Sequence, residues 1–252
     1  IVGRRGRVPA VRLRSGFPPW PPERVPADRY AGIGHMSEGN SQLVKLFENA
    51  VKEVVEKVKE RKMSVSISEI AKCLRYSYYQ TVRPTVSEKM VLGIEAHEYV
   101  ERVIKDVLSA YGLNCESEYR VASGARVDVL CVDKYLTPYV IELKFTSNPS
   151  SENPFMTWYL RQLRYYMALV MSNNSYRRSV GVLMLLSYEY DRYYVHTIEM
   201  SESEMQSVLR EIEDRMSALG MAKQTGTLPK EERGPWCQYC PYRRQCGTVQ
   251  LL

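Results

Sequence analysis

Two acidic residues and one lysine near the middle of this 252-residue chain have the spacing of a cation site: Asp128, Glu142 and Lys144. They lie in two segments with the apolar alternation of β-strands, separated by a turn centred on Tyr135. If the strands pair symmetrically about Tyr135, Asp128 and Glu142 are direct cross-strand neighbours with Cβ atoms about 5 Å apart. The alternation places these acids and Lys144 on one face and apolar residues on the other.

Two carboxylates this close repel each other unless a cation or a proton lies between them. Oxygen ligands suit Mg²⁺ or Mn²⁺, and such an ion lowers the pKa of bound water and stabilises charge on a phosphoryl oxygen. Lys144, two residues along the same face, could then hold or activate the water. A solvated cross-strand salt bridge fits the same pattern, so both interpretations stay open at this point.

The helix expected after this hairpin carries polar, basic and aromatic residues in alternation. Gln162 and Tyr166 are four residues apart and share one face, with Trp158 one turn earlier. Arg161 and Arg164 lie among the aromatic residues, an arrangement that suits single-stranded DNA through phosphate neutralisation and base stacking. Packing of an aromatic-rich helix on the sheet is the competing interpretation.

A histidine precedes the hairpin in a segment of helical pattern. His97 is followed by Glu98 and Glu101, and Gly93 in the same pattern indicates close packing or a nearby ligand. A single histidine on a helix is ordinarily a structural residue. His196, near the end of a predicted strand, is also interpreted as structural.

Six cysteines without a secretory signal favour metal or cluster ligands over a disulfide framework. Four of them have the spacing of a metal site: Cys73, Cys237, Cys240 and Cys246. Four thiolates so arranged bind zinc or an iron-sulfur cluster, and chemistry alone favours zinc. Cys131, on the apolar face of its strand, is expected to be a small buried side chain, and Cys115 is expected to have no special role.

The net charge of +6 is concentrated in residues 1–35, where seven Arg face two acidic residues. This proline-rich leader ends in Gly-His-Met, which is typical of a cloning junction, so we interpret it as non-native or disordered; a basic DNA-binding arm is the alternative. No apolar run approaches the roughly 20 residues of a membrane span. The composition is that of a globular protein, expected in the cytoplasm and without membrane contact.

Hydrophobic periodicity predicts a mostly helical part followed by a sheet-containing core. We expect four domains or regions: the leader 1–35, a helical part 36–111, a sheet-containing core 112–222 and a cysteine-containing tail 223–252 that packs with Cys73. The predicted helices are Ser41–Lys62, one capped by Ser66 or Ser68 that carries Cys73, one from Ser87 to about Tyr111, Pro154–Met171 and Ser201–Leu219. The predicted strands are Glu118–Val121, Arg126–Val132, Tyr139–Phe145, Ser179–Ser187 and Tyr193–Ile198.

Four ordered motifs resemble those of the RecB-like branch of the PD-(D/E)XK nucleases. They are Gly93-x3-His97, Gly124-x3-Asp128, Glu142-x-Lys144 and Gln162-x3-Tyr166. With one cysteine before them and three after, the chain resembles the CRISPR-associated RecB-like exonucleases, the Cas-four type. Val127 stands where the superfamily has the Pro of its name, a substitution usual in this branch.

The resemblance implies an α/β, restriction-endonuclease-like core with a mixed central sheet flanked by helices, a helical N-terminal part and an iron-sulfur tail. His97, Asp128, Glu142 and the main-chain carbonyl of Leu143 would bind Mg²⁺ or Mn²⁺. Lys144 would position the attacking water. The Gln162 and Tyr166 pair would support the site and contact DNA. The resemblance also favours an iron-sulfur cluster over zinc, with 4Fe-4S preferred and 2Fe-2S left open.

The implied activity is hydrolysis of single-stranded DNA by metal-activated water, as an exonuclease and in some relatives an endonuclease. The implied pathway is CRISPR spacer acquisition beside integrase proteins, and homo-oligomerisation is left open. A RecB-like iron-sulfur nuclease of DNA repair or replication is the second hypothesis. A non-catalytic DNA-binding subunit of the integration complex is the third, and the intact Asp128, Glu142 and Lys144 argue against it.

Overall fold

The computed structural model describes residues 64–85, 88–121 and 124–247, together with Asn49, and of residues 88–96 only the backbone. The chain divides into two compact units, 1–54 and 55–252, and the description below concerns the second. The leader 1–35 and, except for Asn49, the predicted helix Ser41–Lys62 lie outside the described residues. None of the helices in the described ranges is long and apolar enough to cross a membrane.

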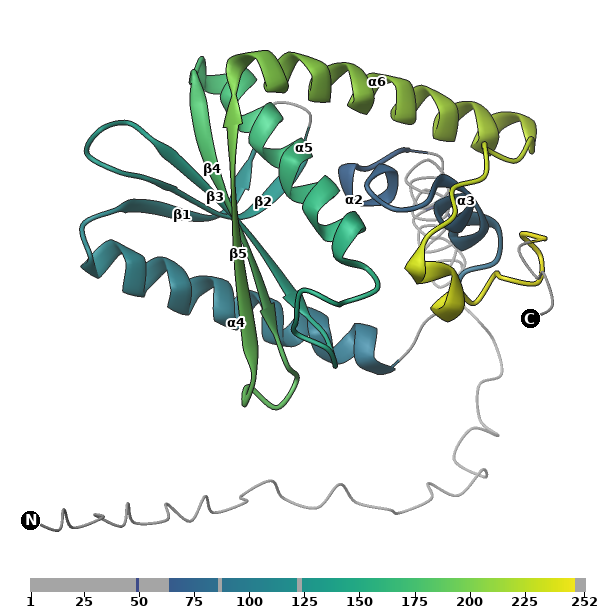
Figure 1. Ribbon diagram of the computed structural model, residues 1–252, viewed down its shortest axis with the longest axis horizontal. Helices are drawn as coiled ribbons and strands as arrows, with labels where there is room; N and C mark the ends of the chain where they lie inside the picture. The colour runs from purple at the N-terminus through teal and green to yellow at the C-terminus, as the bar shows by residue number, and fades with distance from the viewer. Residues whose placement is uncertain (1–48, 50–63, 86–87, 122–123, 248–252) are drawn as a thin grey trace, which may run out of the picture. The chain divides into compact units, whose positions relative to one another are not determined.

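The described part of the chain contains both helices and strands, as expected of an α/β protein, with a helix between its third and fourth strands (Figure 1). In chain order they are α2 (Ile67–Ile70), α3 (Leu74–Val82), α4 (Glu88–Ala110), β1 (Asn114–Arg120), β2 (Arg126–Val132), β3 (Pro138–Phe145), α5 (Met156–Asn174), β4 (Arg178–Leu186), β5 (Tyr193–Ser201), α6 (Glu202–Thr225) and the short 3₁₀ helix η2 (Pro235–Tyr239). The predicted mixture of helices and strands is confirmed, and α5 and α6 continue beyond their predicted C-terminal ends.

Within the described ranges the five strands form one mixed sheet in the order β1-β2-β3-β4-β5. β3 and β4 run parallel, and the other neighbours are antiparallel. A parallel pair requires a crossover connection, and α5 supplies it. β3 is therefore the central strand, with an antiparallel hairpin partner on one side and a crossover partner on the other.

The β2–β3 hairpin has the predicted register. Val129 pairs with Ile141 and Val132 with Pro138, which places the centre of symmetry at Tyr135. The Asp133 carboxylate stabilises the turn by accepting hydrogen bonds from the backbone N–H groups of Tyr135 and Thr137, both at 2.9 Å. The ladder ends at Val129 and Ile141, one position short of Asp128 and Glu142.

Both faces of the sheet are covered by helices. α5 and α6 lie on one face and α4 on the other, as Figure 1 shows. Leu130 and Val140 pack into the cluster formed with α5 and α6, whereas Val129 and Ile141 pack against α4. The expectation that one side of the hairpin is apolar and the other polar is therefore wrong, because the side that carries Glu142 is also buried.

Cys73 does not lie on a helix, contrary to the prediction. Ser66 caps α2 through a capping box with Glu69, as expected, but α2 ends at Ile70 and Cys73 occupies the N-cap position of α3. Arg215 of α6 lies at the interruption and donates to the carbonyl oxygens of Ile70 at 2.7 Å and Lys72 at 2.6 Å. These long-range hydrogen bonds stabilise the break between α2 and α3.

The sheet edge differs from the prediction at Cys115. β1 begins at Asn114 rather than Glu118, and Cys115 is the direct cross-strand partner of Cys131. The two sulfurs form a disulfide. Cys131 is fully buried, as expected, but the reading of both cysteines as side chains without a special role is wrong.

The segment after α6 packs on α3. Arg75 donates to the carbonyl oxygen of Pro229 at 2.8 Å, and the Tyr242 hydroxyl donates to that of Arg83 at 2.7 Å. Trp236 of η2 is buried in a small cluster with Cys73 and Trp158. This segment is therefore held by contacts with α3 and α5 rather than by a core of its own.

Candidate active site

Three backbone elements carry the predicted metal ligands, of which His97 and Asp128 lie in one compact group with Glu101, without Glu142. His97 comes from α4, Asp128 from β2, and Glu142, Leu143 and Lys144 from β3. His97 Nε2 lies 3.1 Å from the carbonyl oxygen of Leu143 and 3.4 Å from Asp128 Oδ2. Asp128 Oδ2 also accepts a 2.7 Å hydrogen bond from the backbone N–H of Leu143, which holds this carboxylate beside the central strand.

The His97 ring is held from its other side by Glu101. Nδ1 of the imidazole lies 2.6 Å from Glu101 Oε1. Burial opposes protonation of His97, but the hydrogen bond to Glu101 and the negative charge of Asp128 outweigh it and raise the pKa of His97 to about 9. In the described part of the chain, ligand atoms of His97, Glu101 and Asp128 all lie within 4.8 Å of one another. Negative charge thus gathers around this histidine.

Glu142 is fully buried, and one of its carboxylate oxygens bonds to the Lys144 ammonium. The other oxygen, Oε2, has no hydrogen-bond partner among the described residues. Burial and then the charge of Asp128 raise the pKa of Glu142 to about 7. An unpaired buried carboxylate oxygen is costly unless a cation satisfies it, so the donor set fits a divalent metal. The burial also excludes a solvated surface salt bridge.

Lys144 stays an ammonium in this environment. Burial opposes its charge, but Glu142 and then Asp128 raise the pKa of Lys144 above its usual range. Its hydrogen bond to Glu142 fixes the side chain beside the acidic residues. Lys144 can therefore donate hydrogen bonds and stabilise negative charge, but it does not accept a proton.

Gln162 and Tyr166 are both buried on α5 and contact each other. Gln162 Nε2 donates to the Tyr166 hydroxyl oxygen at 3.2 Å. Burial and then the charge of Glu142 raise the pKa of Tyr166, so its phenol remains protonated. Tyr166, His97 and Asp128 line a cleft of about 580 Å³ that gives access to the site.

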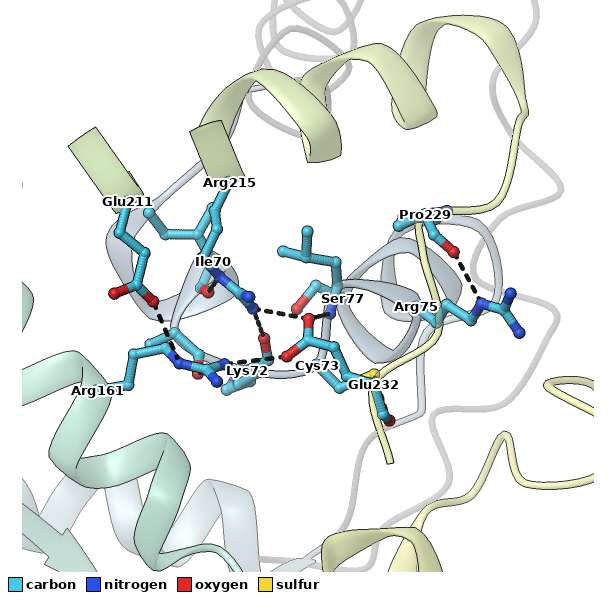
Figure 2. Close-up of polar contacts among 12 residues, drawn as sticks. Ile70, Lys72, Cys73, Arg75, Ser77, Arg161, Glu211, Arg215, Pro229 and Glu232 are labelled. Atoms are coloured by element: carbon cyan, nitrogen blue, oxygen red, sulfur yellow. Dashed lines mark hydrogen bonds and ion pairs between the residues drawn. The ribbon is translucent and has the colours of Figure 1, made fainter. Parts of the chain in front are cut away.

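The three residues predicted to contact DNA from α5 have other neighbours. Trp158 is buried between Trp236 and Phe155, with ring centroids 5.5 and 5.2 Å away. Arg161 donates to Glu232 Oε2 and to the carbonyl oxygen of Ala71, both at 3.2 Å, and Figure 2 shows it beside Glu232.

Arg164 is exposed, but its position on α5 is two residues from both Gln162 and Tyr166. Residues two apart on a helix point to opposite sides. Any contact of Arg164 with DNA would therefore use a surface other than the catalytic cleft.

The four cysteines with metal-site spacing have free thiols and lie around the start of α3: Cys73, Cys237, Cys240 and Cys246. Burial raises the pKa of the Cys73 thiol, and the charge of Cys246 adds to that effect. The pKa of Cys240 is also raised, by burial and then by Cys237 and Cys246. Arg75 Nη1 lies 3.7 Å from the Cys246 sulfur. The structure thus brings thiols from both ends of the described chain into one region.

Glu101 is the functional residue that the sequence reasoning missed. It was noted beside His97 but given no role, although residues four apart on a helix are neighbours. The structure makes it the direct partner of the His97 ring, with 4% of Glu101 exposed. The i,i+4 spacing of a carboxylate and a histidine was the available signal.

Comparison with protein-family profiles shows the superfamily of this chain. The sequence profile of the PD-(D/E)XK nuclease superfamily matches residues 27–247, most of the chain, so the protein belongs to this superfamily. No curated protein sequence matches.

Among solved structures, the chain is similar to SSO0001, with 17% identity and a TM-score of 0.47, over 79% of this chain and 98% of that one. It is also similar to the alkaline exonuclease LHK-Exo from Laribacter hongkongensis, with 15% identity and a TM-score of 0.37, over 66% of this chain and 92% of that one. The protein is thus a nuclease of PD-(D/E)XK type, a class that uses a divalent metal.

Proposed function

We propose that this protein is a metal-dependent deoxyribonuclease that hydrolyses phosphodiester bonds of single-stranded DNA as an exonuclease. The observation that carries the proposal is the unpaired, fully buried Oε2 of Glu142 beside Asp128, with Lys144 bonded to the other carboxylate oxygen. A surface ion pair does not leave a buried carboxylate oxygen without a partner. A bound cation would supply the partner that Glu142 Oε2 lacks.

Four groups would hold Mg²⁺ or Mn²⁺: His97 Nε2, Asp128, Glu142 and the main-chain carbonyl of Leu143. When bound, the metal lowers the pKa of a water molecule and neutralises charge on the phosphoryl oxygens. Lys144, held by Glu142, donates to the attacking water and to the charge that develops on the phosphate. The Tyr166 hydroxyl oxygen accepts a hydrogen bond from Gln162, so the O–H of Tyr166 can donate to an acceptor on the substrate.

Cleavage of labelled single-stranded DNA in Mg²⁺, Mn²⁺ or EDTA tests the proposal. We expect Asp128→Asn and Glu142→Gln to lose activity by at least about a hundredfold, because each removes a charge from the site. Glu116→Gln is the matched control, since Glu116 is an exposed strand glutamate on β1. Cleavage that persists in EDTA, or at the wild-type rate in both variants, would refute the assignment.

We also propose that the four cysteines bind an iron-sulfur cluster, with 4Fe-4S preferred. The support is the order of the cysteines, which resembles that of the CRISPR-associated RecB-like exonucleases, and the proximity of Cys246 to Cys73 and to Cys240, whose thiol pKa values it raises. The ligands of the cluster join the segment after α6 to the start of α3, so the role of the cluster is structural.

The absorbance of the purified protein tests this cofactor. An iron-sulfur cluster absorbs near roughly 400 nm, whereas zinc is silent, and iron and sulfide analysis gives its composition. Cys73→Ala should lose the absorbance and lower the melting temperature. Full absorbance together with an unchanged melting temperature in that variant would contradict a four-thiolate cluster.

For the pathway, we propose processing of DNA for CRISPR spacer acquisition beside integrase proteins. The support is the resemblance to the CRISPR-associated RecB-like exonucleases in the order of motifs and cysteines. Addition of the nuclease to an integration reaction should shorten the inserted fragments, and Glu142→Gln should not. If both proteins give fragments of equal length, a role in repair or replication becomes the better assignment.

A further inference from the structure

The buried contact between Glu101 and His97 defines a role for a residue that the catalytic motifs do not include. We propose that Glu101 is a positioning residue that fixes the proton of His97 on Nδ1 and so keeps Nε2 available as a metal ligand. The inference rests on the metal site of the proposed function.

The proton position follows from the partners of the ring. A neutral imidazole has one N–H and one lone pair. A carboxylate accepts hydrogen bonds only, so the 2.6 Å contact with Glu101 requires the N–H at Nδ1. In the metal-free protein the raised pKa of His97 means that Nε2 is protonated too, and it donates to the carbonyl oxygen of Leu143 at 3.1 Å, beside Asp128 Oδ2 at 3.4 Å. When Nε2 loses that proton, its lone pair faces these two oxygens.

Once Nε2 is deprotonated, its lone pair and these two oxygens repel each other unless a cation lies among them. With Glu101 removed, the neutral ring can instead place its proton on Nε2 and donate to Leu143 or Asp128. That tautomer satisfies both oxygens and blocks the metal position. Glu101 therefore raises metal affinity by making the competing hydrogen-bonded arrangement unfavourable, and its charge makes Nε2 more basic.

Glu101 acts through His97 rather than as a metal ligand of its own. Its carboxylate contacts Nδ1, whereas Leu143 and Asp128 contact Nε2. The two ring nitrogens point in different directions, so one ion cannot bind both of them. Glu101 is buried, whereas Glu98, three residues earlier on the same helix, is exposed.

Mn²⁺ binding measured by calorimetry tests the proposal. We expect Glu101→Gln to weaken Mn²⁺ binding by about 10- to 100-fold, the usual effect of losing such an outer partner. Glu98→Gln should bind as the wild type does. Because Gln is close in size to Glu, a thermal melt shows whether each variant is folded.

Nitrogen-15 spectra of the Mg²⁺-bound protein give a second readout that does not depend on activity. The wild type should show His97 protonated at Nδ1, and Glu101→Gln should reduce that preference. Wild-type Mn²⁺ affinity in Glu101→Gln, with His97→Asn still impaired, would overturn this inference alone. Unchanged Mn²⁺ affinity in His97→Asn would instead overturn the proposed metal site.

Discussion

Replacement of Glu232 should destabilise the protein far more than replacement of the glutamate next to it. Glu232 accepts hydrogen bonds from Arg215 at 2.9 Å, Arg161 at 3.2 Å and the backbone N–H of Leu74 at 3.3 Å (Figure 2). It thus connects α6, α5 and the first turn of α3. The side chains of Glu232, Arg161 and Arg215 are 21%, 20% and 14% exposed, so solvent screens their charges only in part.

The size of the effect follows from these contacts. A hydrogen bond to a charged group contributes about 1.5–3 kcal/mol, and removal of one partner from a buried ion pair costs about 3–5 kcal/mol. Both arginines keep backbone acceptors, since Arg215 still bonds to Ile70 and Arg161 to Ala71. For Glu232→Ala we therefore expect a loss of about 2–3 kcal/mol, or about 4–12 °C in melting temperature for a domain of this size.

Urea denaturation followed by circular dichroism measures this loss. Glu231→Ala is the matched control, because Glu231 pairs with Arg233 and Arg75 at the surface and its removal should leave the denaturation midpoint unchanged. Equal losses in the two variants, or no loss in Glu232→Ala, would refute the reasoning that this carboxylate holds three helices together.

Three further outcomes are expected. In the metal-free protein the pKa of His97 is raised from 6.5 to about 9, so metal binding displaces a proton; Mn²⁺ affinity measured from pH 6.5 to 8.5 should rise about tenfold per pH unit, and a flat profile would contradict this. The pKa of Glu142 is raised from 4.5 to about 7, so its contribution to stability is present below 4.5 and is lost as the pH rises through about 7. The melting temperature of Glu142→Gln, relative to that of EDTA-treated wild type, should therefore be higher at pH 8 than at pH 5. A melting-temperature difference that does not change with pH would argue against the raised pKa of Glu142. A Cβ on Gly181 would lie 2.5 Å from Met167 Sδ, so Gly181→Ala should lower the free energy of unfolding by about 1–3 kcal/mol in urea denaturation. At Gly220 on α6 a Cβ would make only an ordinary van der Waals contact, so Gly220→Ala should raise it by about 0.5–1 kcal/mol. The opposite order would contradict the packing described at these two glycines.

The hairpin could be predicted because its geometry is local. The turn around Tyr135 and the alternation of apolar residues determine the register, which is confirmed from Val129 and Ile141 to Val132 and Pro138 and ends one position before Asp128 and Glu142. The burial of Glu142 could not be predicted in the same way. It depends on α5, which follows the hairpin in sequence and covers the face that carries this carboxylate.

Features made by distant segments were missed or misplaced. Cys73 was predicted on a helix because helical periodicity does not show the break between α2 and α3, which Arg215, far along the chain, stabilises through two carbonyls. The disulfide of Cys115 and Cys131 required the register of β1, whose start was predicted at Glu118. Glu118 has a left-handed backbone with φ of 52°, which interrupts the strand pattern that alternation alone can recognise.

The central position of β3 has a consequence for how the site moves. Its backbone pairs with β2 as far as Ile141 and with β4 as far as Phe145, and such a strand opens only with much of the domain. Beyond Ile141 the Leu143 N–H donates to Asp128, so we expect Glu142, Leu143 and Lys144 to exchange their amide protons slowly. His97 comes from α4, which covers one face of the sheet. Local opening that releases α4 would therefore separate His97 from Asp128 and Glu142, which would stay in place on β2 and β3. Amide exchange should then slow along α4, and much less along β3, when metal joins the two.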